Sequence, residues 1–410
     1  MRTYVIVTRY FPSAEEWRGA YCLDFAKALT QQLAHARHDG PWKVCVFVPG
    51  AKDYEIEGIQ VRGFRELRLP SNVFPFLFSR RNRRSFLDAV ARAGIDVGEV
   101  SVCHGHTADC AIYPLALKAK NPNCRTLLHH HDLCSFGLNL GILHTCWLYN
   151  LIQFPILRRV HEQIDCHVFI SSASRRSFLA APDTSWTTYA DYKRQMRGLP
   201  YRPVRIKDSV ILHNGVDMRM FGAQGPKPES EGARREFVIG CVANFQPLKD
   251  QMTLLKAVKL IRDGAVGSSL GEDAKLKVRF VGGGETLAVC KRYAAENGID
   301  SEFLSEVRHE ELPAFYRTLD LFVMPSYFEG FGCVYTEAHA CGAPFMACEG
   351  QGIEDVLPQD ERSRWLCKPG DPASLAQKIR DYLENRWEQK LLSDQSIEAL
   401  VAEFVRTSLG

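Results

Sequence analysis

The chain has 410 residues, 46% of them hydrophobic, and a formal net charge of +3 at pH 7. This length suits two domains that each bury a core, and so small a net charge argues against a nucleic-acid-binding protein. The 14 cysteines are scattered, without a C-x-x-C pair or a zinc-finger spacing, which predicts reduced, buried thiols. No apolar run is long enough to span a bilayer and the N-terminus lacks the pattern of a signal peptide, so we expect a cytoplasmic protein with peripheral membrane contact at most.

The first half begins with a strand, a loop and a helix. Residues 4–8 are apolar and predict a strand, and apolar residues at helical spacing predict a helix over 21–33. The loop between them lies at the carboxyl end of the strand, where doubly wound sheets bind ligands, and Gly19 would let the backbone approach a phosphate there. Further strands are predicted at 44–48 and 56–62.

An arginine-rich segment follows over residues 65–84. Apolar residues are interleaved there with six arginines: Arg65, Arg68, Arg80, Arg81, Arg83 and Arg84. One interpretation is a solvated helix surface. The other is a basic and apolar patch that rests on an anionic membrane or meets an anionic acceptor, with Arg80 and Arg81 on the acceptor side.

Histidines gather at two predicted strand ends. Residues 99–110 predict a strand end followed by His104 and His106, and a strand over 125–132 ends in His129, His130, His131 and Asp132. Consecutive residues of a strand point to opposite faces, so at most two of the three adjacent histidines can share a metal site. We therefore expect these side chains to serve a ligand-binding edge of the sheet, and we expect no metal site. For His104, His129 and His130 the alternative is that they are polar loop residues without a ligand.

The remainder of the first half is less regular. The sequence predicts a packed apolar helix at 138–157, a strand at 166–171, an irregular insertion at 181–208, a strand that closes the half from 210 and turns at Asn214-Gly215, and a polar linker at 222–235.

The second half opens with an apolar strand over 237–242, a loop that contains Asn244 and Lys249, and a helix over 252–261. A lysine in such a loop is well placed to neutralise a phosphate. The alternative is a solvated lysine at the helix start, where the helix dipole disfavours a positive charge.

Two further elements carry turn and cap signals. A strand over 278–281 leads into three glycines, and we place the middle one, Gly283, in a tight turn near a bound ligand. Residues 369–383 predict a helix whose N-terminus is capped by Asp371 or Ser374.

The most informative stretch is a strand over 319–324, a turn over 327–332 and a helix that begins near Cys333. A helix N-terminus after a strand and a glycine turn binds anions through backbone N–H groups and the helix dipole. Glu329 and Glu337 flank it, and carboxylates accept hydrogen bonds from sugar or ribose hydroxyls. The alternative is a capped turn with two solvated glutamates.

Glu329 and Glu337 in the stretch EGFGCVYTE form an E-x7-E pattern that resembles the signature of retaining GT-B glycosyltransferases of family 4, the glycosyl transferases group 1. The resemblance implies an α/β fold of two doubly wound Rossmann-like domains that face each other across a cleft. It implies an acceptor-binding domain over 1–222, a nucleotide-sugar-binding domain over 235–383, and a C-terminal helix within 384–410 that returns to the first domain.

The resemblance also assigns roles to single residues. In this family the two glutamates hold the donor sugar and the ribose, and the backbone between them contacts sugar and phosphate; here these are Glu329, Glu337, Gly330, Phe331, Gly332 and Cys333. Lys249 would contact the pyrophosphate, while Asn244 stands where the family has an arginine. His131 would face the donor sugar beside Asp132, and His106 would end the preceding strand.

The function implied is transfer of a sugar from a UDP- or GDP-sugar to a carbohydrate or lipid-linked acceptor hydroxyl, with retained anomeric configuration, in polysaccharide or glycoconjugate synthesis. No D-x-D-type metal motif stands out in the sequence, so we expect neither a metal nor another cofactor. Two alternatives remain open, a GT-B-like sugar-nucleotide epimerase and a non-catalytic nucleotide-sugar-binding protein. Labelled sugar nucleotides distinguish them by yielding acceptor-linked product, epimer or binding alone.

Overall fold

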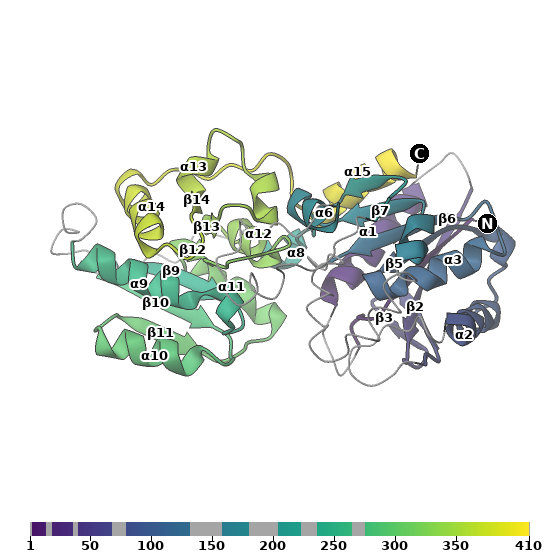
Figure 1. The fold of residues 1–410 in the computed structure, drawn as a ribbon, viewed down its shortest axis with the longest axis horizontal. Helices are drawn as coiled ribbons and strands as arrows, with labels where there is room; N and C mark the ends of the chain where they lie inside the picture. The colour runs from purple at the N-terminus through teal and green to yellow at the C-terminus, as the bar shows by residue number, and fades with distance from the viewer. Residues whose placement is uncertain are drawn as a thin grey trace. The chain divides into compact units, whose positions relative to one another are not determined.

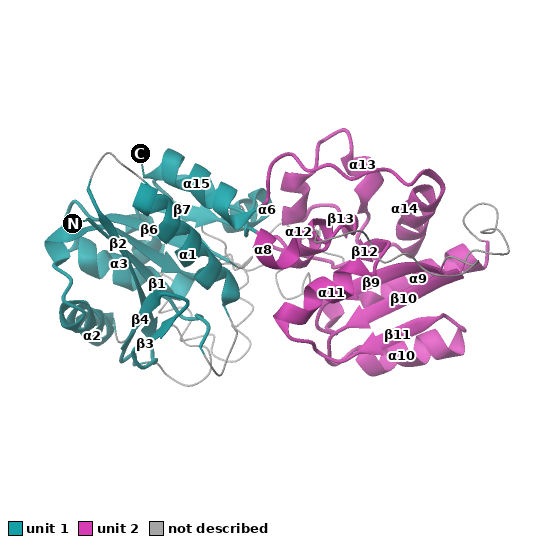
Figure 2. Ribbon diagram, turned by 180° about the vertical axis from the view of Figure 1, so that it is seen from behind, with its two compact units in different colours: residues 1–183, 196–215, 396–410 teal, residues 184–195, 216–395 magenta. Residues whose placement is uncertain are grey.

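The computed structural model describes residues 2–13, 19–35, 40–67, 79–131, 158–179, 204–222, 236–264 and 275–409. The chain forms two compact units (Figure 2): unit 1 comprises residues 1–183, 196–215 and 396–410, and unit 2 comprises residues 184–195 and 216–395. In the described part, the chain leaves unit 1 after Gly215 and returns to it after Gln395.

Unit 1 is built on an eight-stranded sheet in the order β3-β4-β2-β1-β5-β6-β7-β8. Its strands are β1 Arg2–Thr8, β2 Trp42–Pro49, β3 Tyr54–Ile56, β4 Ile59–Phe64, β5 Val100–His106, β6 Arg125–His130, β7 Cys166–Phe169 and β8 Ser209–Ile211. All neighbours pair in parallel except β3 with β4. Residues 3–8 of β1 are buried throughout, as expected for a strand covered on both faces.

Helices cover both faces of this sheet (Figure 1). They are α1 Ala20–His35, α2 Ser79–Arg92, α3 Ile112–Lys118, α6 Ser172–Leu179 and α15 Ile397–Ser408, with short 3-10 turns at η2 Val97–Glu99 and η3 Ala108–Ala111. Tyr4 and Ile6 pack in one core with α1 and α15, whereas Val5 and Val7 pack in the other with α2 and α3. The period of two along β1 produces this division.

Unit 2 contains a six-stranded, all-parallel sheet in the order β11-β10-β9-β12-β13-β14. The strands are β9 Glu236–Val242, β10 Lys275–Val281, β11 Ser301–Leu304, β12 Leu321–Val323, β13 Phe345–Cys348 and β14 Leu366–Cys367. The helices are α8 Met218–Phe221, α9 Gln251–Arg262, α10 Leu287–Glu296, α11 Leu312–Arg317, α12 Cys333–Ala340, α13 Arg362–Trp365 and α14 Pro372–Asn385. Three short 3-10 turns complete it, η4 Pro247–Lys249, η5 His309–Glu311 and η6 Gly352–Val356.

The prediction of two parallel-sheet α/β domains is confirmed. The cap of α14 is also as predicted, since the Asp371 carboxylate accepts hydrogen bonds from the Ala373 and Ser374 amides, both at 3.0 Å. The described cysteines carry no disulfide and all except Cys333 are buried, in agreement with the expected reduced thiols.

Two predicted strands differ from the structure. The strand expected at 56–62 is instead an antiparallel hairpin of β3 and β4, because Glu57 and Gly58 have φ values of 47° and 78° and reverse the chain. The strand expected at 319–324 begins only at Leu321, because the Leu319 amide still donates to the Tyr316 carbonyl of the preceding helix. The helix predicted at 138–157 lies outside the described residues, as do most of the insertion at 181–208 and of the linker at 222–235.

Candidate active site

In unit 2, the turn between β12 and α12 places Glu329 and the residues after it at the start of a helix. Gly332 has a φ of 79°, and a Cβ atom there would lie 2.7 Å from the Tyr335 ring, so both backbone and packing require glycine. The amide groups of the first turn of α12 and the positive end of its dipole follow directly, at Cys333. Gly330 and Phe331 lie in the same turn, and Phe331 is buried.

Lys249 reaches this turn from a second strand end. It closes η4, between β9 and α9, and its ammonium group forms an ion pair with the Glu329 carboxylate across 80 residues of sequence. The two side chains are 24% and 13% exposed. The structure thus brings together the residues predicted to contact the donor phosphate and the donor sugar.

The loops after β9 and β10 are packed on each other. The Phe245 amide donates to the Gly283 carbonyl at 2.7 Å. A Cβ atom on Gly282 would lie 2.3 Å from the Ala243 carbonyl oxygen, whereas one on Gly283 would meet nothing closer than 3.6 Å. The backbone therefore requires glycine at Gly282, whereas Gly283, the position predicted from the sequence, has room for a side chain. Asn244 is exposed on this loop.

Glu337 lies on α12 and forms a buried hydrogen-bonded group with Tyr316 and His309. It is 8% exposed and accepts hydrogen bonds from the Tyr316 hydroxyl at 3.0 Å and from His309 Nε2 at 3.3 Å. Burial, followed by the Glu337 charge, raises the pKa of Tyr316 well above its usual value, so its hydroxyl stays a donor. Sequence analysis missed Tyr316 and His309, because neither lies in the E-x7-E stretch.

In unit 1, His106 and His131 meet at the ends of β5 and β6. His106 Nδ1 lies 2.8 Å from His131 Nε2, and the two rings stack with centroids 5.0 Å apart. Burial lowers the pKa of His131 to about 3, against a hydrogen bond from Asn214 that raises it, so the imidazole is neutral. A small cavity beside His131 is lined by Tyr21 and the predicted turn at Asn214.

The structure also describes three other residues predicted for unit 1, Gly19, Arg80 and Arg81. Gly19 precedes α1 with a φ of 90°, and a Cβ atom there would lie 2.4 Å from the Tyr10 carbonyl oxygen, so the glycine serves backbone packing. Arg80 and Arg81 are exposed on α2. Asp132 lies outside the described residues, as do residues 68–78 of the arginine-rich segment.

Comparison with known proteins bears on the family and the fold of the chain. Residues 226–399 match the glycosyl transferases group 1 family. The protein is a glycosyltransferase that contains a domain of this group and has the GT-B fold. No described helix has both the length and the hydropathy needed to cross a membrane.

Two relatives show how far the similarity extends. One relative is a GDP-mannose-dependent alpha-(1-6)-phosphatidylinositol monomannoside mannosyltransferase of Mycolicibacterium smegmatis. It is 25% identical to the glycosyltransferase, and the alignment covers 86% of the glycosyltransferase and 82% of the relative. The glycosyltransferase is 30% identical to a D-inositol 3-phosphate glycosyltransferase of Salinispora arenicola, over half of its own chain and 45% of that protein.

Solved structures share the fold. Sucrose-phosphate synthase from Thermosynechococcus elongatus superposes with a TM-score of 0.61 at 19% identity, covering 99% of the glycosyltransferase and 94% of the synthase. The HepE protein of Anabaena, solved with UDP and glucose, gives a TM-score of 0.59 at 16% identity, covering 98% and 94%.

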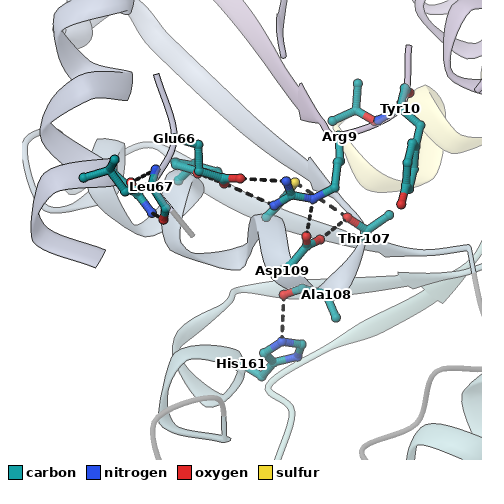
Figure 3. Close-up of polar contacts among 12 residues, drawn as sticks. Arg9, Tyr10, Glu66, Leu67, Thr107, Ala108, Asp109 and His161 are labelled. Carbon is teal, nitrogen blue, oxygen red and sulfur yellow. Dashed lines mark hydrogen bonds and ion pairs between the residues drawn. The ribbon is translucent and has the colours of Figure 1, made fainter. Parts of the chain in front are cut away.

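Sequence analysis of the glycosyltransferase also missed a charged cluster at the strand ends of unit 1 (Figure 3). Arg9, directly after β1, donates to both carboxylate oxygens of Glu66, at 2.6 and 3.1 Å, and pairs with Asp109 after β5. Tyr113 donates to Glu66, and Thr107 donates to Asp109. Each member follows or faces a strand end, but only the sheet order brings them together.

Proposed function

We propose that the glycosyltransferase moves a sugar from a GDP- or UDP-sugar to an acceptor hydroxyl with retention of configuration at the anomeric carbon. The observation that carries the proposal is the Lys249–Glu329 ion pair beside the N-terminus of α12. It pairs a cation suited to the leaving phosphate with a carboxylate suited to sugar hydroxyls.

The difficult step is departure of the nucleoside diphosphate while positive charge develops on the anomeric carbon. Lys249 and the dipole of α12 would stabilise the negative charge on the leaving phosphate, which is greater in the transition state than in the bound donor. Glu329 holds Lys249 in place before the donor binds, and would then accept hydrogen bonds from the sugar. Attack by the acceptor from the face that the diphosphate leaves would retain the configuration.

Glu337 suits the ribose of the nucleotide. Its two oxygens are oriented by Tyr316 and His309, and each oxygen keeps a further lone pair for a ribose hydroxyl. A charged acceptor that is already fixed in direction loses little side-chain entropy when the ribose binds.

The substrates are proposed from the named relatives. A mannosyltransferase that uses GDP-mannose is similar to most of the chain, so GDP-mannose is the first donor to test, with UDP-sugars next. The acceptor would be a carbohydrate or a lipid-linked polyol, in glycoconjugate synthesis. The proposal includes no metal ion or other cofactor in the transfer step, and it includes peripheral contact with an anionic membrane through the exposed arginines of α2.

The experiment is a thermal-shift panel of nucleotide sugars followed by transfer assays with labelled donor. A donor at about a hundred times its dissociation constant adds roughly 2.7 kcal/mol to the free energy of unfolding. We expect one nucleotide class to raise the Tm and then to give acceptor-linked label with the α-linkage of the donor. Release of an epimerised sugar nucleotide, or binding without any transfer to a panel of polyol and glycolipid acceptors, would overturn the proposal.

A further inference from the structure

Two neighbouring strands of unit 1 each carry an H-x-H pair at the carboxyl end. His104 and His106 lie in β5, which ends at His106. His129 lies in the adjacent strand β6, which ends at His130, and His131 follows directly. The strands are parallel, and His106 is the Cα partner of His129. Residues two apart on a strand share a face, so all four imidazoles lie on the face that α1 and α15 cover.

Three of these side chains converge in the core. His104 and His106 are fully buried and His129 is 3% exposed. The His104 and His129 rings are parallel, with centroids 5.4 Å apart. One ring nitrogen from each of His104, His106 and His129 lies within 4.8 Å of the other two. The surroundings are apolar, since Phe25 and Phe404 pack against the rings.

The Nδ1 atoms of His104 and His106 have hydrogen-bond partners. His104 Nδ1 lies 2.9 Å from the Tyr4 hydroxyl, and His106 Nδ1 lies 2.8 Å from His131 Nε2. In contrast, His104 Nε2, His106 Nε2 and both nitrogens of His129 are buried and have no hydrogen-bond partner among the described residues. A buried polar atom without a partner costs about 1–3 kcal/mol, so four at one place call for a bound species.

We propose that His104, His106 and His129 bind one divalent transition-metal ion of the class that prefers imidazole, with Zn²⁺ as the representative. Three histidine nitrogens at about 2.0–2.1 Å, with a fourth position for water or a small ligand, make a tetrahedral site. Tyr4 would orient the His104 ring and His131 would orient the His106 ring, each through the Nδ1 atom of that ring. Such hydrogen bonds to the second ring nitrogen are usual around metal-bound histidines. One ion would then satisfy a nitrogen of all three rings at once.

A second buried histidine group on the opposite face serves as the internal comparison. His130 Nε2 lies 2.9 Å from His167 Nδ1, His167 Nε2 lies 3.1 Å from the His161 carbonyl oxygen, and His161 Nε2 lies 3.1 Å from that of Ala108. These nitrogens already have protein partners, so this group does not need an ion. The proposed ion joins β5 to β6 beneath α1 and is structural, separate from the chemistry at Lys249 and Glu329.

The test uses the full chain without a histidine tag. After equilibration with Zn²⁺ and extensive dialysis, elemental analysis is expected to find about one ion per chain. Co²⁺ is expected to give the strong visible absorption of tetrahedral nitrogen coordination. At free Zn²⁺ about a hundred times the dissociation constant, the Tm is expected to rise by about 3 °C or more.

Variants then locate the site. His104→Gln and His129→Gln are expected to weaken Zn²⁺ binding by about a hundredfold or more, whereas His167→Gln leaves the stoichiometry at one. Less than about a tenth of an ion per wild-type chain together with an unchanged Tm would overturn the proposal, and this measurement stands even where a core variant fails to fold. Loss of the ion from His167→Gln but not from His129→Gln would overturn the assignment to this face.

Discussion

The residues with the clearest chemical roles are held by partners that lie far from them in sequence. Lys249 is a cation in partly buried surroundings whose charge is balanced by Glu329, so the lysine is positioned before any phosphate arrives. Such preorganised charge costs no reorganisation when the transition state forms, and for that reason it is worth more there than a mobile surface lysine.

Lys249→Ala is predicted to lower kcat by about a hundredfold or more, since removal of one preorganised donor to developing negative charge typically costs about 2.7–4 kcal/mol. The donor KM should change much less, because the lost interaction strengthens toward the transition state. Steady-state kinetics with a saturating acceptor measure both constants. Lys256→Ala, which removes an exposed lysine of α9, is the matched control. An unchanged kcat in Lys249→Ala would make Lys249 a surface residue without a role in transfer.

Glu337→Gln is predicted to weaken binding of the free nucleoside diphosphate by about 10- to 150-fold, because a hydrogen bond to a charged group is worth about 1.5–3 kcal/mol. Tyr316→Phe should cause a smaller loss, of about tenfold at most, since it only releases one carboxylate oxygen. Isothermal titration calorimetry measures both. Glu310→Gln changes an exposed glutamate nearby and should bind normally. Normal affinity in Glu337→Gln would remove this residue from the nucleotide site.

At the scale of elements, β6, β7 and the helical residues 158–163 share a buried histidine cluster. Burial lowers the pKa of His161 to about 3 and that of His167 to about 4, whereas both titrate near 6.5 in the unfolded chain. Between these values the unfolded state binds more protons than the folded state. Stability is therefore full above pH 6.5 and falls as the pH decreases toward 4.

This sign gives a measurable prediction. From pH 7.5 to pH 5.5, each of the two histidines should remove about 1.4 kcal/mol from the free energy of unfolding, about 2–3 kcal/mol in all. Urea unfolding at the two pH values measures the difference. The double variant His161→Gln, His167→Gln should lose that part of the pH dependence, while His35→Gln, at an exposed position of α1, should keep it. Equal pH dependence in the double variant and the wild type would show that these two imidazoles are protonated in the fold.

At the scale of the whole molecule, the predicted functions are divided between the units. Lys249, Glu329 and Glu337 belong to unit 2, whereas His131 belongs to unit 1. His131→Ala is therefore predicted to lower transfer by about tenfold or more while the dissociation constant of the nucleoside diphosphate stays within about twofold. Calorimetry and a transfer assay on the same preparation measure the two effects. Lost nucleotide binding with normal turnover at saturation would place the nucleotide site in unit 1.

The exposed arginines of α2 make a prediction about the molecule's surroundings. Arg80, Arg81 and Arg84 should each contribute about 1 kcal/mol to binding anionic lipid, so their joint replacement by glutamine should abolish sedimentation with anionic vesicles. Wild-type sedimentation should fall steeply as salt shortens the Debye length below about 8–10 Å. Replacing exposed Lys256, Lys291 and Arg292 of unit 2 is the matched control. A wild-type protein that ignores anionic vesicles at low salt would refute membrane contact through α2.

The sequence by itself determined the type of most elements and the position of the turn that carries Glu329, because apolar periodicity, glycines and caps act over a few residues. Alternation along β6 also settled that His130 faces away from His129 and His131, and it packs with His167 on the other face. Local pattern failed at 56–62, where Glu57 and Gly58, both with positive φ, reverse the chain between two short alternating runs.

Only the tertiary structure decided which side chains meet. Lys249 meets Glu329, and Arg9 meets Glu66 and Asp109, from segments that are distant in sequence. Tyr316 of α11 meets Glu337 of the next helix, α12. The order of parallel strands determines which of their carboxyl ends are neighbours, and that order is set by the packing of whole helices and strands. For the same reason two unremarkable H-x-H pairs became one buried group of imidazoles only when β5 and β6 paired in register.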